Sequence, residues 1–167
     1  MKSLLILRHA QAVHFGDTSD HDRPLTEKGI HDAQRMARLF RGIRPTQILS
    51  STAKRAVATA EQVVQVARLS TNIQTMRGLY ESDVSEHLEI LRSVAAAVDS
   101  VLLVGHNPTF EQLASTLVGC PVAMKTGALA IIALSIEHWA ALNNTANASL
   151  LGLFCPAMLK KHSEGQD

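Results

Sequence analysis

Short apolar runs alternate along the chain with segments of helical periodicity, and this alternation predicts the fold. The first run, residues 3–7, is followed after a polar loop by an amphipathic segment that begins at Thr26. The same order recurs with apolar runs at 47–50 and 101–104, each followed by a helical segment. Strands that alternate with helices form a parallel sheet covered on both faces. The pattern therefore predicts an α/β fold, a three-layer αβα sandwich with a mainly parallel sheet.

The helical segments carry apolar residues at the spacing of threes and fours that places them on one buried face. Thr26 is a suitable N-cap for the first helix, and residues 84–98 have the spacing of a later one. Thr109 and Gln112 form a potential capping box for a helix that ends at Gly119. The predicted buried faces of the first two helices are Ile30, Ala33, Ala37 and Phe40, and then Ala56, Ala60, Val63 and Ala67.

The last part of the chain has apolar runs without intervening helices. Residues 128–134, 138–142 and 149–154 are joined by turns, which is typical of antiparallel strands added to the sheet. Nothing in the sequence marks a linker or an internal repeat. We therefore predict a single domain over residues 1–159 and a polar tail over residues 160–167.

Composition narrows the choice of partners and compartment. The 167 residues are 46% hydrophobic and 19% charged, and the formal net charge is +1. This balance is that of a globular domain, and it favours neither nucleic acid nor a membrane surface as a partner. Cys120 and Cys155 lack metal-type spacing, so we expect two buried thiols in a reducing, cytoplasmic compartment. The chain is expected to be a monomer.

Polar functional groups follow three of the predicted strands, at the point where each strand ends. Arg8 and His9 follow the first, Arg55 lies one helical turn beyond the second, and His106 and Asn107 follow the third. Because the carboxyl ends of parallel strands line the ligand crevice of an open sheet, we expect these groups to converge. Guanidinium groups, imidazoles and a helix N-terminus together suit a tetrahedral oxyanion such as phosphate.

Each of these residues also has an ordinary structural interpretation. Arg8 and His9 could end a strand in solvent, His106 could be a core histidine, and Arg55 could be a cation on a helix surface. Their joint occurrence favours function, because the structural interpretation needs three coincidences at equivalent strand ends.

The chain resembles the histidine phosphatase (phosphoglycerate mutase-like) superfamily in the order and spacing of its motifs. The matching motifs are Arg8-His9, Ser50-Ser51 followed by Arg55 and Thr59-Ala60, and Gly105-His106-Asn107-Pro108. Short length, Arg23-Pro24-Leu25-Thr26 with Lys28-Gly29, and Leu79-Tyr80-Glu81 are similar to the small SixA-type phosphohistidine phosphatases. The resemblance implies a phosphohistidine intermediate on His9. It departs at Ala10, where the family usually has glycine.

The chemistry of these side chains agrees with that implication. A neutral His9 imidazole whose Nδ1–H is held by a carbonyl presents a lone pair at Nε2 that can attack phosphorus. Arg8, Arg55 and His106 would stabilise the charge on the equatorial phosphoryl oxygens, and Asn107 is expected to bind phosphate with them. The scheme requires no metal and no cofactor, and the eight histidines show no metal-binding motif.

The general acid is less well defined by the sequence. Glu81 is the candidate that the resemblance implies, while Asp17, Asp20 and Asp22 in the loop after His9 are alternatives or turn-forming residues. A phosphoramidate substrate relaxes the requirement, because imidazole leaves more readily than an alkoxide.

The short segment 71–85 predicts an open pocket, which suits a phosphohistidine displayed on another protein. We therefore expect a phosphatase that acts on a phosphohistidine-bearing protein of a phosphorelay or phosphotransfer system. Two alternatives remain open at this point. One is a small-molecule phosphomonoesterase of the same superfamily. The other is a noncatalytic phosphate- or phosphoprotein-binding module, which Ala10 and the undefined acid allow.

Overall fold

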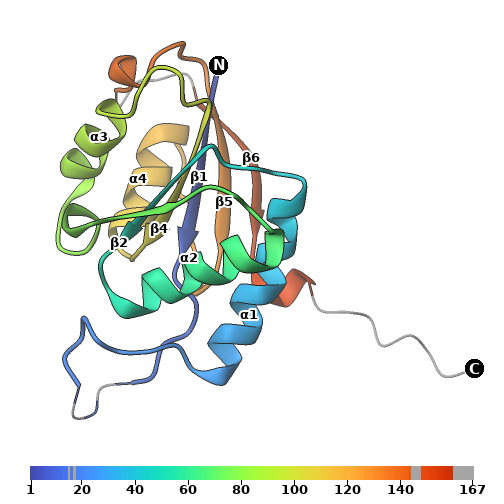
Figure 1. Cartoon of the computed structure of the whole chain (residues 1–167). Coiled ribbons are helices and arrows are strands. Elements are labelled where there is room, and N and C mark those ends of the chain that lie inside the picture. Colours follow the sequence, from blue (N-terminus) through green and yellow to red (C-terminus); the bar gives the residue numbers. More distant parts are fainter. Residues whose placement is uncertain (15, 17, 144–147, 160–167) are drawn as a thin grey trace, which may run out of the picture.

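A computed structural model describes residues 1–14, 16, 18–143 and 148–159, and it contains one six-stranded sheet (Figure 1). The strand order is β3-β2-β4-β1-β5-β6. The first four strands in this order pair in parallel, whereas β5 and β6 are antiparallel additions. The strands are β1 (Lys2–Arg8), β2 (Gln47–Ser51), β3 (Ile73–Met76), β4 (Ser100–Gly105), β5 (Leu129–Leu134) and β6 (Ala148–Phe154). The predicted fold class is confirmed, and the predicted tail at 160–167 lies outside the described residues.

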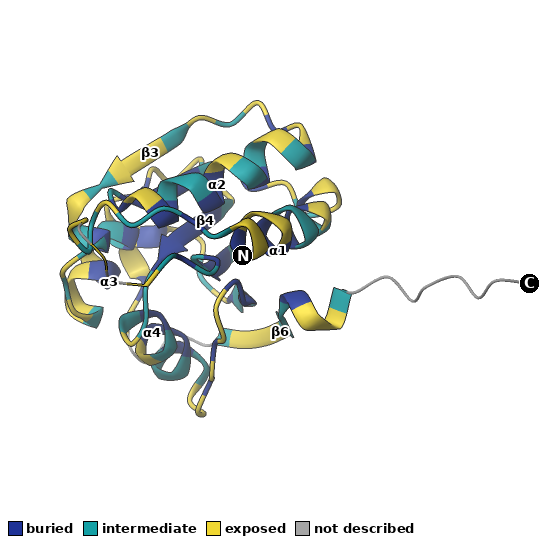
Figure 2. Cartoon of the chain, turned by 90° about the horizontal axis from the view of Figure 1, so that it is seen from below, coloured by how far each residue is buried: buried dark blue, intermediate teal, exposed yellow. Residues whose placement is uncertain are grey.

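Helices cover both faces of the sheet. The α-helices are α1 (Glu27–Ala37), α2 (Lys54–Ala67), α3 (Val84–Arg92) and α4 (Thr109–Val118), with 3-10 helices η1 (Arg38–Arg41), η2 (Arg77–Leu79), η3 (Trp139–Ala141) and η4 (Pro156–Leu159). Successive residues of a strand point to opposite faces, so Leu5 and Leu7 pack with α1 and α2, while Leu4 and Ile6 pack with α3 and α4. The central strands are consequently buried on both sides (Figure 2).

The predicted apolar faces of the helices are largely correct. The four predicted positions of α2 are all buried. On α1 the prediction of Ile30 is wrong, since its side chain is 37% exposed, and Met36 is buried there instead. Ile30 lies one residue beyond Gly29, whose α-carbon packs against the Gln11 backbone so closely that a β-carbon would lie 2.0 Å from the Gln11 carbonyl oxygen. Gly29 therefore makes the close contact in the first turn of α1, and the side chain of the next residue, Ile30, points away from this contact toward solvent.

Three predictions of local structure and one of burial are wrong. The capping box of α4 does not form, because the Thr109 hydroxyl donates to the carbonyl of Ser82 in the preceding loop. Helix α3 ends at Arg92, short of residue 98, and the predicted strand at 138–142 is the turn η3, where Trp139 is fully buried. Cys120 is exposed and Cys155 is half-buried, so they are not two buried thiols.

The strand register brings the functional ends of the chain together. Arg8 of β1 pairs with Gly105 of β4, and Ser50 of β2 pairs with Val104 of β4, so the carboxyl ends of these strands lie at one edge. A β-carbon on Gly105 would lie 2.7 Å from the Phe110 ring, so only glycine permits this approach. Among the described residues, no helix is long and apolar enough to cross a membrane.

Candidate active site

The five residues predicted at the strand ends line one cavity of about 480 Å³. These are Arg8, His9, Arg55, His106 and Asn107. The rings of His9 and His106 lie 5.0 Å apart between centroids, and Arg55 contacts both. The remaining lining residues are Gln11, Ala12, His14, Asp20, Arg23 and Thr126. The predicted convergence of the strand ends is therefore present in the fold.

The surroundings of His9 select the tautomer that nucleophilic attack needs. Its Nδ1 lies 2.7 Å from the carbonyl oxygen of Ala10, so Nδ1 carries the proton and donates it. Nε2 is then unprotonated, and its lone pair accepts a hydrogen bond from Arg55. Burial lowers the pKa of His9 to about 4, assisted by the nearby Arg55, Arg8 and Arg23 and opposed by the bond to Ala10. The imidazole is thus neutral at pH 7.

Arg55 connects the two histidines. Its Nε–H donates to Nε2 of His9 at 3.3 Å, and Nη2 lies 3.3 Å from Nδ1 of His106. The same guanidinium donates to the backbone carbonyl of Asp20 and, at 3.0 Å, to its carboxylate. The Arg55 side chain is only 6% exposed. Since its donors already face protein acceptors, an incoming phosphoryl group must replace some of them.

His106 is also neutral in this site. Nδ1 accepts from Arg55, so the proton lies on Nε2, which donates to the hydroxyl of Ser51 at 2.8 Å. Burial, assisted by the neighbouring His9 and Arg55 and opposed by Asp20, lowers the pKa of His106 to about 3. His106 is therefore a neutral group in this site, where the arginines carry the positive charge.

Arg8 and Asn107 are held by the loop that precedes β5. Nη1 of Arg8 and Nδ2 of Asn107 both donate to the carbonyl of Met124, at 2.8 and 3.0 Å. Arg8 Nε and Asn107 Oδ1 are buried without a hydrogen-bond partner among the described residues. This shared acceptor connects β1, the start of α4 and the loop, and it was not apparent in the sequence because it is a backbone atom.

The carboxylate that reaches the cavity is Asp20. It accepts from Arg23 Nη2 at 2.7 Å, from Arg55 Nη2 at 3.0 Å and from the Tyr80 hydroxyl at 2.8 Å. Partial burial raises the pKa of Asp20, but the bonds from Tyr80, Arg23 and Arg55 outweigh this and hold the pKa well below its usual range. Asp20 is therefore ionised at pH 7.

The structure does not bring Glu81 to the other predicted residues. Glu81 is exposed and lines a neighbouring cavity of about 550 Å³ that also contacts Asp20 and Tyr80. Asp22 is exposed at the loop surface, where it accepts from Ser19, and Asp17 lies outside the described residues. A catalytic role of Glu81 remains a prediction from the resemblance, and it would require movement of this loop.

Ala10 fits its position without strain. Among the described non-glycine residues only Arg68 has a positive φ, so Ala10 has ordinary backbone angles. Its amide donates to Thr59 Oγ1 at 3.1 Å, and its methyl group packs in a small cluster with Leu25 and Ala33. Alanine in place of the family's usual glycine therefore fits here, and the Ala10 carbonyl still accepts the hydrogen bond from His9 Nδ1.

Two site residues were missed by sequence reasoning as functional groups. The Tyr80 ring lies edge-on to His106 at 5.5 Å, and its hydroxyl orients Asp20. The Ser51 hydroxyl accepts the hydrogen bond from His106 Nε2. Both lie within motifs quoted from the sequence, but their contacts depend on how the loops meet in space.

No three His, Cys, Asp or Glu side chains are grouped to hold a metal ion in the part of the chain that the structure describes. The donors in the His9 cavity are guanidinium and imidazole groups, which bind oxyanions. The site can therefore bind a tetrahedral oxyanion beside a nucleophilic nitrogen.

Comparison with known proteins agrees with this geometry. A sequence model of the histidine phosphatase superfamily (branch 1) matches residues 4–97. An uncharacterised chloroplastic protein of Arabidopsis thaliana is 31% identical over 93% of this chain and 78% of its own length. A candidate SixA phosphohistidine phosphatase structure from Agrobacterium tumefaciens has a TM-score of 0.80 and 27% identity, covering 93% of this chain and 98% of its own.

A structure of the protein histidine phosphatase SixA complexed with tungstate is also similar. Its TM-score is 0.81 at 26% identity, and the match covers 95% of this chain and 99% of that one. The family match, the SixA-like fold and the paired histidines with Arg55 agree on one class of hydrolase, a phosphatase. The chain belongs to the histidine phosphatase superfamily, branch 1.

Proposed function

We propose that this phosphatase hydrolyses protein phosphohistidine, and that His9 carries the phosphoryl group between the two half-reactions. The observation that carries the proposal is the unprotonated Nε2 of His9, whose lone pair lies in one cavity with Arg8, Arg55 and His106. Such a lone pair beside oxyanion donors is what phosphoryl transfer to nitrogen requires.

In the first step the phosphoryl oxygens accept hydrogen bonds from Arg8 and Arg55, and also from His106 once the bound anion has drawn a proton from solvent onto its Nδ1. The Arg55 Nε–H turns from His9 Nε2 to a phosphoryl oxygen, which frees the lone pair for attack. A bond forms between Nε2 and phosphorus, and the bond from phosphorus to the leaving nitrogen breaks. The hydrogen bond from His9 Nδ1–H to Ala10 stabilises the positive charge that develops on the ring.

In the second step water attacks phosphorus from the side that the leaving group vacated. The bond from phosphorus to His9 Nε2 breaks, and its electron pair returns to the imidazole. One proton of the water stays on the released phosphate and the other passes to solvent. Arg8 and Arg55 remain in place through both steps, so the charge on the equatorial oxygens is stabilised twice.

The state of Asp20 supports a phosphohistidine substrate over a phosphate ester. An alkoxide leaving group needs a proton donor, and Asp20 is the carboxyl group that lines the described cavity. Its hydrogen bonds keep it ionised at pH 7, so it has no proton to donate. An imidazole whose second nitrogen is already protonated leaves as a neutral ring without such help.

The short connection beside the site also supports a protein substrate. Between β3 and α3 the chain forms only the turn η2, so no longer insertion covers the cavity there and a protein surface can approach it. The similarity to SixA structures at 26% and 27% identity points to the same substrate class. The expected partner is a phosphohistidine-bearing component of a phosphorelay or phosphotransfer system.

Parallel assays test the proposal. A phosphohistidine protein and a panel of sugar and nucleotide phosphates are compared by kcat/KM, with and without a chelator. We expect the phosphohistidine protein to be preferred and the chelator to have no effect. Preference for the esters would support the small-molecule phosphatase instead. Absence of turnover on every substrate, with phosphate binding retained, would support the noncatalytic binding module.

A further inference from the structure

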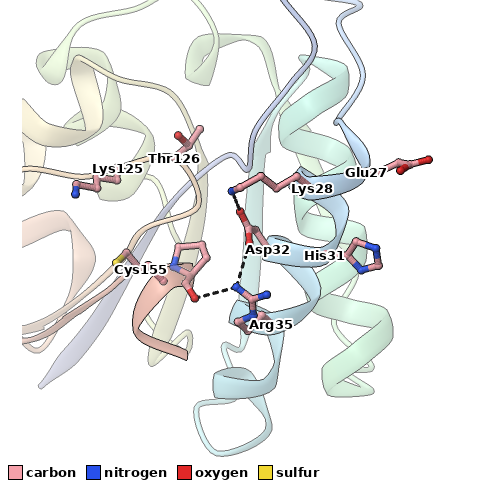
Figure 3. Close-up of a pocket in the computed structure, with 10 residues that line it drawn as sticks. Glu27, Lys28, His31, Asp32, Arg35, Lys125, Thr126 and Cys155 are labelled. Carbon is pink, nitrogen blue, oxygen red and sulfur yellow. Dashed lines mark hydrogen bonds and ion pairs between the residues drawn. The ribbon is translucent and has the colours of Figure 1, made fainter. Parts of the chain in front are cut away.

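A larger cavity, of about 630 Å³, adjoins the one that contains His9. It lies between α1 on one side and the loop at residues 125–126 with the start of η4 on the other (Figure 3). Thr126 lines both cavities, so they are neighbours on one surface. The proposed mechanism uses none of the other residues that line the larger cavity.

The α1 wall of this cavity is a fixed network of charges. The Asp32 carboxylate, whose side chain is 11% exposed, pairs with Lys28 Nζ at 2.5 Å and with Arg35 Nη1 at 3.2 Å. Arg35 Nη1 also donates to the carbonyl of Pro156 at 3.1 Å, which joins α1 to η4 across the cavity (Figure 3). The hydrogen bond from Arg35 to Pro156 therefore fixes the distance between α1 and η4 on the two sides of the cavity.

The charges that line the cavity are predominantly positive. Lys28, Arg35 and Lys125 oppose the carboxylates of Asp32 and Glu27, which leaves one net positive charge. In Figure 3 the Glu27 carboxylate and the Lys125 ammonium both point away from the space between the two walls, so Lys28, Arg35 and Asp32 set the charge of the interior, which keeps one net positive charge. The adjoining His9 cavity adds three arginines against one carboxylate. The two cavities form one positively charged strip.

We propose that the larger cavity is the docking groove for an acidic polypeptide segment that flanks the phosphohistidine of a protein substrate. The inference rests on the proposed function. When the phosphoryl group of a substrate phosphohistidine lies beside His9, the residues that flank this phosphohistidine in the substrate can extend past Thr126 into the groove. Carboxylates there would lie near the exposed Lys28 and near Lys125, which lines the opposite wall, and opposite charges across an interface favour encounter and register.

Two synthetic peptides test this groove. Each carries one phosphohistidine, flanked by aspartates in one peptide and by lysines in the other. Wild-type protein is expected to hydrolyse the acidic peptide with about tenfold higher kcat/KM. Lys125→Glu should reduce or reverse that preference, and Lys28→Gln should reduce it by a smaller factor. Inorganic phosphoramidate, which cannot reach the groove, should be hydrolysed equally by all three proteins.

Arg44→Glu is the matched control. Arg44 is exposed near the amino ends of β2 and β4, at the opposite edge of the sheet, and its side chain donates to the Arg68 carbonyl. The Arg44→Glu variant changes the net charge by the same amount as Lys125→Glu, and it should keep the wild-type preference for the acidic peptide.

The outcomes separate the docking groove from the catalytic proposal. If wild type shows no preference for the acidic peptide, or Lys125→Glu changes it no more than Arg44→Glu, the groove is refuted while phosphohistidine hydrolysis stands. An equal loss on phosphoramidate would mean that Lys125→Glu disturbs catalysis, which also refutes docking. If wild type hydrolyses esters but neither peptide, the proposed function and the groove both fall.

Discussion

Asp20 competes with the substrate for Arg55, and replacing it with asparagine measures that competition. In the site without an oxyanion, Arg55 donates to both the carbonyl and the carboxylate of Asp20. Arg23 and Tyr80 hold the same carboxylate from other directions. A phosphoryl group must draw Arg55 from this internal anion while lying near its negative charge. Asp20→Asn keeps the shape of the side chain and removes the charge.

The size of the effect follows from the contacts. A hydrogen bond to a charged group contributes about 1.5–3 kcal/mol, and a neutral amide in place of the carboxylate keeps a bond from the guanidinium but loses the attraction between two opposite charges. The Asp20 side chain is 33% exposed, so solvent screens part of the difference. A net gain of about 1.4 kcal/mol for the incoming anion corresponds to about tenfold tighter binding.

Calorimetric titration with inorganic phosphate or tungstate at pH 7 measures this gain. We expect the Kd of Asp20→Asn to be about tenfold lower than that of wild type. Asp22→Asn is the matched control, because it removes the same charge from the same loop at a side chain that is 66% exposed. Its Kd should stay within about twofold of wild type. An unchanged or higher Kd for Asp20→Asn would refute the competition.

Three further predictions concern the site and its support. Arg55→Lys should lower kcat/KM about 100-fold, because an ammonium cannot reproduce the planar contacts to both histidines. The free energy of unfolding should fall as the pH drops from about 6.5 toward 4, because the unfolded chain then takes up protons while buried His9 and His106, with pKa values of about 4 and 3, stay neutral. His9 alone accounts for about 3 kcal/mol in acid denaturation curves measured by circular dichroism. An unchanged free energy of unfolding would contradict the neutral site. Gly105→Ala should lower the free energy of unfolding by about 1–3 kcal/mol in urea titrations, because its methyl group would overlap the Phe110 ring, and a neutral effect would contradict the close approach.

The sequence was sufficient to predict a mainly parallel sheet with antiparallel additions and the residues at its carboxyl edge. Periodicity identifies strands and buried helical faces, as at Ala56, Ala60 and Val63 of α2, because burial on one side imposes that spacing. The convergence of Arg8, His9, Arg55 and His106 follows from the parallel pairing of β1, β2 and β4.

Contacts made by loops were beyond sequence reasoning. The position of Asp20 over Arg55 depends on the path of an irregular segment, and no period or capping rule describes that path. The same holds for the Met124 carbonyl and for the cavity between α1 and η4, which joins residues far apart in the chain. Local rules also fail where a tertiary contact takes the capping group, as at Thr109.

Direct detection of phosphate on His9 is the most stringent test of the mechanism. Protein mixed with a phosphohistidine substrate is quenched at alkaline pH, where the bond from phosphorus to nitrogen persists, and the modified residue is mapped by mass spectrometry. We predict phosphate on His9 in the wild type and none in His9→Ala, which should also lose turnover while it keeps phosphate binding. Phosphate on a serine or cysteine, or undiminished turnover by His9→Ala, would contradict the account.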